Sequence, residues 1–441
     1  MPQPPILSDL LEAVNKKIPS VKAHWELYCL RRKIYNIEGK DLEIERTKHA
    51  QRDLFSIRVI DDMRAGASSC SVLEDLPDAF DAALKIAQIS EPDENLSIPE
   101  PDITENISVF DENLLHLKES LPDLLLKLQR AAFADKRIKK LRNAEINITI
   151  DEKAIINSKG ISLYQPFTTI SSHIVAISEN GQSQMAWEYR VERFFKNIHI
   201  EEVGQEAARK AIMLLNPEKI KSFRGCIILH PSVACDFIEL IAQSLSAENY
   251  QMGKSLFIEK IGKMVINSKI NIIDDGKIPE RFGSTPFDGE GVSTNRKTLI
   301  EEGFLKQLMH NTYTAKRDKT FSTGNAIRTD RGLSVGPTNL YIEWKGDKMP
   351  LESLIKKVDR GVYVIEVMGM HTANPVTGDF SVGIAGIYIE KGELKHPVKE
   401  AVISGNIINL FNNILATDED LKFYGHIGSA TLLVEGIDIS G

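Results

Sequence analysis

The chain has 441 residues, of which 42% are hydrophobic and 26% are charged, and its formal net charge is −8. This composition is ordinary for a soluble globular protein, and the length suffices for two or three domains. The acidic balance argues against direct binding of nucleic acid, which usually relies on a basic stripe, and no apolar run reaches the roughly 18 residues of a membrane span.

The N-terminal stretch MPQPPILSDLLEAVNKK lacks the charged region and apolar core of a secretory leader. The cysteines form no CxxC pair and no dense framework, so reduced thiols are the simplest interpretation. They are Cys29, Cys70, Cys226 and Cys235. We therefore expect a cytoplasmic protein.

Residues 1–90 are predicted to form a first α+β unit. An opening helix is followed by strand-like stretches, among them residues 24–30 and 33–38. The segment DLPDAFDAALKIAQIS then repeats apolar residues at a period of 3.6, which indicates a helix. Asp75 and Pro77 are residue types that suit its first turn.

Residues 91–106 are acidic and carry three prolines, which is typical of an exposed linker. A second α+β unit is expected over 107–216. It should contain a long helix over 112–133, a hairpin whose turn is Asn-Ser-Lys-Gly at 157–160, and a closing helix over 204–215.

Beyond Gly225, glycine becomes frequent and short strands alternate with Asp-Gly, Glu-Gly and Lys-Gly turns. This spacing is typical of a β-rich domain with many hairpins, and helices are expected to interrupt it over 231–247 and 350–358. The predicted fold class is therefore α+β, with a mixed helix and strand N-terminal region and a β-rich C-terminal domain over 221–441.

The segment CIILHPSVACDFIEL, residues 226–240, begins as a buried strand, turns at His-Pro and continues as an amphipathic helix. Pro231 suits the first helical position, which places His230 at the helix N-terminus. His230 and Cys235 are residue types that bind zinc. Positions five apart lie about 140° apart around a regular helix, so the two side chains converge only at a helix end or a bulge.

Two interpretations of this corner are open. In the first, His230 and Cys235 are ordinary corner and core residues. In the second, they bind a metal with His426 as a third ligand. A proteolytic zinc site also needs a general base beside the first histidine, and Pro231 at that position has no acid–base chemistry.

Phrases along almost the whole chain resemble the TldD/PmbA family, also known as the modulators of DNA gyrase or the TldD/TldE peptidases. Their shared order makes the resemblance specific. The phrases are SIRVIDDMRAGASS, IINSKGISL, IIDDGKIPERFGSTPFDGEGVSTNRKTLIEEGFLKQLMHNTYTAKR, HTANPVTGDFSVGIAGIYIEKGELKHPVKEAVISGN and LLVEGIDISG.

The resemblance implies one of two branches. TldD chains carry an HExxxH zinc motif and a C-terminal cysteine ligand and are catalytic metallopeptidase subunits. TldE (PmbA) chains share the fold without that site and pair with TldD in a heterodimer that acts on extended or unstructured peptides. Here the motif is replaced by His230-Pro231-Ser232-Val233-Ala234-Cys235.

The C-terminal segment ATDEDLKFYGHIGS contains no cysteine either. The resemblance therefore implies a TldE/PmbA-like chain without catalytic residues. We expect no cofactor in this chain and zinc in a TldD-like partner, with His230 and Cys235 as vestiges of the metal site.

Peptide binding is a further expectation from the resemblance. Glycines in GDFSVGIAGIYIE allow close backbone approach, and an extended peptide can add to a sheet edge through main-chain hydrogen bonds. The preceding loop is expected to line a groove, and two arginines in a second polar loop suit a peptide carboxylate. The candidate residues are His371, Thr372, Asn374, Asp379, Arg328 and Arg331.

Three functional hypotheses are open. The chain is a non-catalytic subunit that joins a TldD-like partner and holds peptide, with a homodimer as an option when the partner is absent. Alternatively, it is a divergent metallopeptidase active alone through His230, Cys235 and His426. The third hypothesis is a non-proteolytic modulator of a DNA gyrase-linked process, without direct DNA contact because the chain is acidic.

Overall fold

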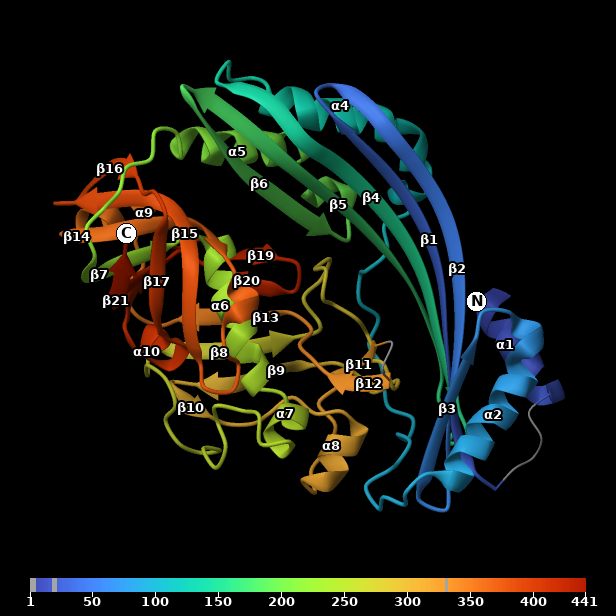
Figure 1. Cartoon of the computed structure of the whole chain (residues 1–441). Helices are drawn as coiled ribbons and strands as arrows, with labels where there is room; N and C mark the ends of the chain where they lie inside the picture. Colours follow the sequence, from blue (N-terminus) through green and yellow to red (C-terminus); the bar gives the residue numbers. More distant parts are fainter. Residues whose placement is uncertain (1–4, 18–21, 330–331) are drawn as a thin grey trace.

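The computed structural model describes residues 5–17, 22–329 and 332–441, and Figure 1 shows a long arched sheet that curves around a β-rich C-terminal part. The arched sheet has the strand order β3-β2-β1-β4-β5-β6, and all neighbouring strands are antiparallel. Its strands are β1 (His24–Lys40), β2 (Glu43–Asp61), β3 (Arg64–Cys70), β4 (Ile138–Asn157), β5 (Ser162–Asn180) and β6 (Gln182–Glu192).

Strand β1 joins the two regions predicted as separate N-terminal units, because it pairs with β2 on one edge and with β4 on the other. The two strands predicted between residues 24 and 38 form one continuous strand. Two arginines in its middle bridge to the neighbouring strands: Arg31 Nη2 lies 2.9 Å from Asp53 Oδ2, and Arg32 Nη2 lies 2.7 Å from Asp151 Oδ2. These cross-strand ion pairs support extended backbone where the sequence shows no apolar alternation.

Helices pack against this sheet at both ends. They are α1 (Pro5–Lys17), η1 (Leu73–Asp75), α2 (Leu76–Ile89), α3 (Asn113–His116), η2 (Leu117–Ser120), α4 (Leu121–Ala132), η3 (Phe195–Asn197) and α5 (Ile200–Met213). The single helix predicted over 112–133 is divided into α3, η2 and α4. Pro122 lies in the first turn of α4, where its missing N–H prevents an unbroken α-helical hydrogen-bond ladder.

Alternate residues of β4 face opposite sides of the arched sheet. Ile146 and Ile148 share a core with α4 and α5, and Ala154 and Ile156, on the same face, share a core with α1 and α2. Ile155 on the opposite face packs with Phe287 of the C-terminal part. The arch therefore presents one face to its helices and the other, in its lower half, to the C-terminal part.

The C-terminal part contains a closed barrel. Strands β14, β7, β21, β17 and β15 follow one another around it, and pairing of β15 with β14 closes the ring. The strands of this sheet are β7 (Phe223–Leu229), β14 (Arg360–Met368), β15 (Asp379–Glu390), β16 (Glu393–Pro397), β17 (Ala401–Asn406), β18 (Ile414–Thr417) and β21 (Leu432–Ser440).

A second sheet lies beside the barrel in the order β10-β9-β8-β13-β20-β19, and β11 and β12 form a separate hairpin. The strands are β8 (Ile270–Asp275), β9 (Arg296–Glu301), β10 (Phe304–Leu305), β11 (Ala326–Thr329), β12 (Gly332–Val335), β13 (Leu340–Trp344), β19 (Lys422–Tyr424) and β20 (Ile427–Ser429). The helices are α6 (Pro231–Ser244), α7 (Ala247–Gln251), α8 (Thr312–Arg317), α9 (Leu351–Lys356), η4 (Met370–Thr372) and α10 (Ile407–Asn412).

Helix α6 forms the centre of this part. Its apolar residues share one core with barrel strands and with β8, β9 and β13 of the second sheet. Phe237, for example, is fully buried and meets Phe380 of β15 edge to face at 5.0 Å between ring centroids. A helix that is covered on both sides is apolar around most of its circumference, as the sequence of α6 is. The predicted α+β class with a β-rich C-terminal domain is confirmed.

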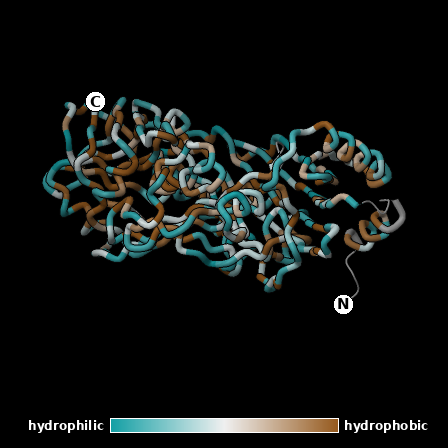
Figure 2. Tube along the Cα trace, turned by 90° about the horizontal axis from the view of Figure 1, so that it is seen from below, coloured by the Kyte–Doolittle hydropathy of each residue, from teal (hydrophilic) through white to brown (hydrophobic). Residues whose placement is uncertain are grey.

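Hydrophobic segments gather in the interior of the C-terminal part, and many hydrophilic segments lie along the outside (Figure 2). None of the helices that the structure describes combines the length and the apolar character needed to cross a membrane.

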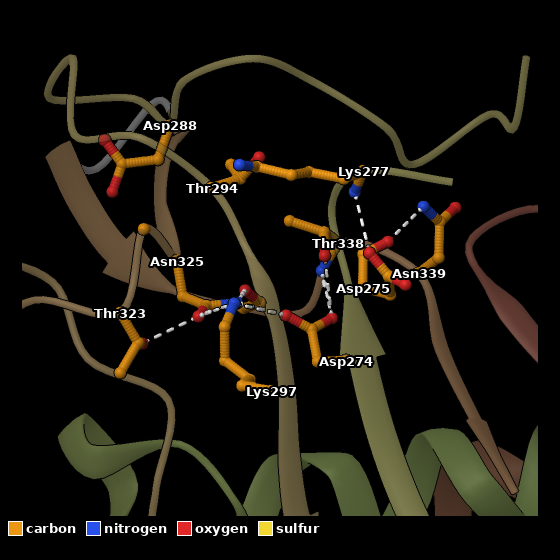
Figure 3. A network of polar contacts seen from close by, with 12 residues as sticks. Asp274, Asp275, Lys277, Asp288, Thr294, Lys297, Thr323, Asn325, Thr338 and Asn339 are labelled. Atoms are coloured by element: carbon orange, nitrogen blue, oxygen red, sulfur yellow. Dashed lines mark hydrogen bonds and ion pairs between the residues drawn. The ribbon is translucent and has the colours of Figure 1, made fainter. Parts of the chain in front are cut away.

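A buried polar network orders the loops that surround the second sheet (Figure 3). Asp274, at the end of β8, is fully buried, and its carboxylate lies 2.9 Å from Lys297 Nζ. It also accepts hydrogen bonds from Asn325 Nδ2 at 2.8 Å and from the backbone N–H of Thr338 at 2.6 Å. One carboxylate thus fixes strand β9 and the loops that precede β11 and β13.

Four charged side chains connect the arched sheet with the C-terminal part. Arg58 Nη2 on β2 lies 2.9 Å from Glu290 Oε1 and 3.4 Å from Glu26 Oε2 on β1. Arg328, on β11, also pairs with Glu26 and donates from Nε to the carbonyl oxygen of Gly289 at 2.8 Å. Both glutamates are fully buried, so the two arginines supply the partners that buried carboxylates require.

Lys297→Met is expected to lower the free energy of unfolding by about 3–5 kcal/mol, because it leaves the Asp274 carboxylate buried without its cation. Urea denaturation measures the change. Lys306→Met is the matched control: Lys306 Nζ lies 3.2 Å from Glu301 in an exposed pair, whose loss should cost no more than about 1 kcal/mol. Equal effects of the two substitutions would contradict the role of the network.

Candidate functional site

The His-Pro corner lies where β7 ends and α6 begins. The His230 N–H donates to the carbonyl oxygen of Val364 on β14 at 3.0 Å, which continues the barrel pairing by one residue. Pro231 occupies the first turn of α6, as the sequence predicts. The His230 side chain caps the helix: its Nδ1 accepts from the Ser232 N–H at 3.3 Å and lies 2.7 Å from Ser232 Oγ.

His230 is 6% exposed and is held between aromatic rings. Its ring centroid lies 6.3 Å from that of Tyr424 and 6.5 Å from that of Tyr363. Burial, assisted by the positive charge of Lys210, lowers the pKa of His230 to about 2, although Glu206 at 3.9 Å from Nε2 opposes the shift. The imidazole is therefore neutral at physiological pH, with Nδ1 engaged as a helix cap.

Cys235 lies one turn further along α6 and is also buried. Its Sγ donates to the carbonyl oxygen of Ile427 on β20 at 3.4 Å, and burial raises the pKa of the thiol well above its usual range. A protonated thiol is a poor zinc ligand, because zinc binds the thiolate.

The third candidate ligand, His426, lies between β19 and β20. Burial lowers the pKa of its side chain, and the charged groups that act on it are Glu239 and Asp274 rather than residues of the His230 corner. Among the residues that the structure describes, no three His, Cys, Asp or Glu side chains lie close enough to hold a metal ion together. His230, Cys235 and His426 therefore do not fit a zinc site.

His230 instead lies in the wall of a large polar cleft between the arched sheet and the C-terminal part. The cleft has a volume of about 1080 Å³. Strand β6 and helix α5 form one wall, and the start of α6, strand β14 and the segment before β19 form the other. Its ionisable lining residues are Arg190, Glu192, His199, Glu202, Glu206, Arg209, His230, Arg281, Tyr363, Asp418, Glu419, Asp420 and Lys422.

The cleft holds charged groups in different protonation states. Arg209 donates to Glu206 from Nε at 2.8 Å and from Nη2 at 2.6 Å. Although burial opposes it, this pairing lowers the pKa of Glu206 to about 2. Burial raises the pKa of Glu192 to about 7, against the influence of Arg281, whose Nη1 lies 3.9 Å away. The wall thus offers both a permanent carboxylate and one that titrates near neutral pH.

The residues of β6 and α5 in this wall were missed by sequence reasoning. The only local signal is the spacing of Glu206 and Arg209, which places them on one face of a helix and equally describes a solvated ion pair. Their position beside His230 depends on how α5 packs between the arched sheet and the barrel.

The four predicted peptide-binding residues after β14 lie together, on an exposed loop away from the cleft. Asn374 Oδ1 accepts from the backbone N–H of Val376 at 2.9 Å, and Asp379 accepts from Asn406 Nδ2 at 2.9 Å. His371 and Thr372 lie in η4 on the same loop.

This loop reaches the C-terminal end of α6, where Ser244 Oγ donates to the carbonyl oxygen of Pro375 at 3.4 Å. His230 lies at the other end of the helix, roughly 20 Å away for a helix of this length. Arg328 lies elsewhere again, in the ion network with Glu26, and Arg331 lies outside the described residues. The structure therefore does not bring the predicted peptide-binding residues into one site.

His230→Gln tests the buried neutral imidazole and retains an acceptor for the Ser232 N–H. Protonation favours the unfolded state, since the pKa of His230 rises from about 2 to its ordinary 6.5 on unfolding. The stability that the buried neutral imidazole contributes to the folded state is complete above pH 6.5 and is lost as the pH falls below that value. Relative to the variant, the wild type should lose about 1.4 kcal/mol of unfolding free energy per pH unit below pH 6 in urea titrations. A constant difference over this range would contradict the assignment.

Comparisons with known proteins match the chain along most of its length. Three family models match, described as PmbA/TldA metallopeptidase domain 1 at residues 25–87, central domain at residues 115–215 and C-terminal domain at residues 224–441. The Escherichia coli O157:H7 protein named Metalloprotease PmbA is 27% identical over 409 residues, which are 90% of this chain and 88% of that protein. A Haemophilus influenzae homolog of PmbA is 28% identical over 92% of this chain and 90% of its own.

Solved structures share the whole fold. A Thermotoga maritima protein described in terms of DNA gyrase modulation superimposes with a TM-score of 0.90 at 27% identity, covering 99% of both chains. TldE from Thermococcus kodakarensis superimposes with a TM-score of 0.88 at 25% identity, covering 99% of this chain and 100% of its own. The resemblance seen in the sequence is thereby confirmed, and the chain belongs to the PmbA/TldD metallopeptidase family.

Proposed function

We propose that this chain is the TldE/PmbA-like, non-catalytic subunit of a TldD/TldE-type metallopeptidase that acts on extended or unfolded peptides. The observation that carries the proposal is the state of the His230 corner. A hydrolytic zinc site needs several ligands around one open coordination position and a general base that activates water. This corner supplies a neutral histidine that is engaged as a helix cap, a protonated thiol and a proline at the position of the base.

The polar cleft supports a role in holding peptide. An extended peptide exposes N–H donors and C=O acceptors at every residue, and the cleft wall offers arginine donors beside carboxylate acceptors. Arg190, Arg209 and Arg281 come from different elements, so they can contact a chain at separate points along its length. The loop that carries His371, Thr372, Asn374 and Asp379 is a second proposed region of peptide contact, and Arg328 is a separate proposed contact elsewhere on the chain.

The proposed partner is a TldD-like subunit that provides the zinc and the general base. The likeness to a TldE structure supports this pairing. A homodimer is the alternative arrangement when the partner is absent. The four cysteines are free thiols, which supports a reducing compartment such as the cytoplasm.

The first prediction from the proposal concerns metal. Protein purified without a metal-affinity tag should contain far less than one zinc per chain by elemental mass spectrometry, and His230→Ala should not change that content. Zinc near one equivalent that disappears in His230→Ala would contradict the proposal and favour a divergent peptidase active alone.

The second prediction concerns activity. A TldD-like subunit from the same family should cleave an unfolded fluorogenic polypeptide about tenfold faster or more when this chain is added in equal amount. The reason is that, in the proposal, both subunits contribute to the surface that holds the peptide. This chain alone should show no cleavage above buffer. Size-exclusion chromatography should detect the complex in the same mixture. A mixture no faster than the TldD-like subunit alone would overturn the proposal.

A further inference from the structure

Three cations gather on the face of the arched sheet that is turned toward the C-terminal part. Lys153 and Ile155 share a face of β4, since residues two apart along a strand point to the same side. Arg32 on β1 shares that face because it lies directly opposite Asp151 of β4. Arg193 directly follows β6 and lies beside them, with its guanidinium 5.0 Å from the ring centroid of Phe167, over which the Lys153 ammonium lies at 4.4 Å. These three side chains, Arg32, Lys153 and Arg193, are called the Lys153 cluster below.

The cluster has an excess of positive charge. Arg32 donates from Nε and Nη2 to the two oxygens of Asp151, both at 2.7 Å, so this carboxylate is already engaged. Within the described parts of the chain, Lys153 Nζ has no hydrogen-bond acceptor and no carboxylate within 4.0 Å. Asp151 is the carboxylate that acts on Lys153 and Arg193 as well, so three cations share one negative charge.

Arg193 is the most buried member of the cluster, with 9% of its surface exposed. Its Nη1 donates to the carbonyl oxygen of Thr168 at 3.3 Å and to Thr169 Oγ1 at 3.0 Å. Its Nε is buried and has no hydrogen-bond partner. A buried donor without an acceptor is rare in native proteins and calls for a ligand or a bound water.

The energetic situation of the cluster favours an anion. Burial lowers the pKa of Lys153 to about 8, assisted by the nearby charge of Arg193, and burial lowers the pKa of Arg193 to about 10. Both groups have lost hydration, and the carboxylate that acts on them, Asp151, is already paired with Arg32, which leaves the burial of their charges only partly compensated. An anion that enters restores both the electrostatic balance and the missing hydrogen bonds.

The surroundings of the cluster suit a planar carboxylate. Arg193 lies between the rings of Phe167 and Phe282, the latter at 5.2 Å, and these contacts restrict the guanidinium group. A restricted guanidinium matches the two oxygens of a carboxylate, and an ammonium group adds a third donor. Arg32 has a side chain that is 43% exposed, so the cluster is open to solvent on its side.

We propose that the Lys153 cluster is a binding site for a peptide carboxylate, either the C-terminal group or an acidic side chain. The identity of the ligand as a peptide rests on the proposed function. The site is distinct from the cleft at His230, because none of the three cluster residues lines that cleft and Phe282 of the C-terminal part covers Arg193. Peptide would thus be held by its charge at one place and by its backbone at another.

Isothermal titration of the full-length chain with three N-acetylated peptides tests this site. The peptides are pentaalanine with a free C-terminal carboxylate, pentaalanine amide, and the amide of Ala-Ala-Glu-Ala-Ala. The expected result is that at least one carboxylate peptide binds about tenfold more tightly than pentaalanine amide, as for a charge-assisted hydrogen bond. Comparison of the free acid with the glutamate peptide identifies which carboxylate is preferred.

Lys153→Met supplies the decisive comparison. It removes the cation, keeps most of the length of the side chain and should fold well, because a partly buried charge is replaced by a thioether beside Phe167. The variant should lose the tenfold preference for carboxylate and bind pentaalanine amide as the wild type does. Lys140→Met, at an exposed position of β4 outside the cluster, is the control and should bind all peptides as the wild type does.

Each remaining outcome overturns the inference. It is wrong if Lys153→Met weakens all three peptides equally, if it weakens none, or if the wild type binds none of them. The rate increase in a mixture with a TldD-like subunit is measured on the same preparations. If the mixture remains active although the wild type shows no preference for carboxylate peptides, the Lys153 cluster is not a carboxylate site and the proposed subunit role still holds.

Discussion

The burial of helix α6 between the barrel and the second sheet is the constraint on which the site depends. Because both sides of the helix are covered, its polar residues are confined to its ends and to a narrow strip. His230 and Pro231 at the N-terminus are consequently the residues of the His-Pro-Ser-Val-Ala-Cys segment that line the cleft. Cys235, one turn later, faces the second sheet and is used for packing against β20.

The same constraint explains why the fold of this corner does not require a bound metal ion. The helix is held by apolar contacts of residues such as Phe237 and by the cap that His230 gives to Ser232. Neither depends on a bound ion. Proline at the first helical position and a cysteine in the core are both compatible with a helix start that has only a structural role.

Local patterns in the sequence were sufficient for much of the fold. The 3.6-residue period and Pro231 predicted the start of α6, and the glycine-containing turns predicted the β-rich C-terminal domain. The shared sheet of the N-terminal region was not predictable in the same way. Its central pairing joins β1 to β4 across more than a hundred residues of sequence, and alternation identifies a strand but not its neighbours.

The site was predicted only in part for a related reason. The residue types at His230 and Cys235 indicated zinc, and the missing base argued against it, so sequence and family resemblance were sufficient to identify this corner as the place to examine for metal chemistry. Glu206, Arg209 and Lys153 carry no distinguishing local signal. The roles of these side chains depend on the groups that tertiary packing places opposite them, when two parts of the chain come together.

Strand β21 has a consequence for how the molecule is made. It lies between β7 and β17 in the barrel and also pairs with β18, although β7 comes some two hundred residues before it in the sequence. During synthesis, β7 emerges from the ribosome some two hundred residues before the strand that completes its pairing. The barrel core, against which α6 packs, can therefore form only after β21 has been synthesised, and a chain that stops before β21 exposes unpaired strand edges that quality-control proteases can recognise.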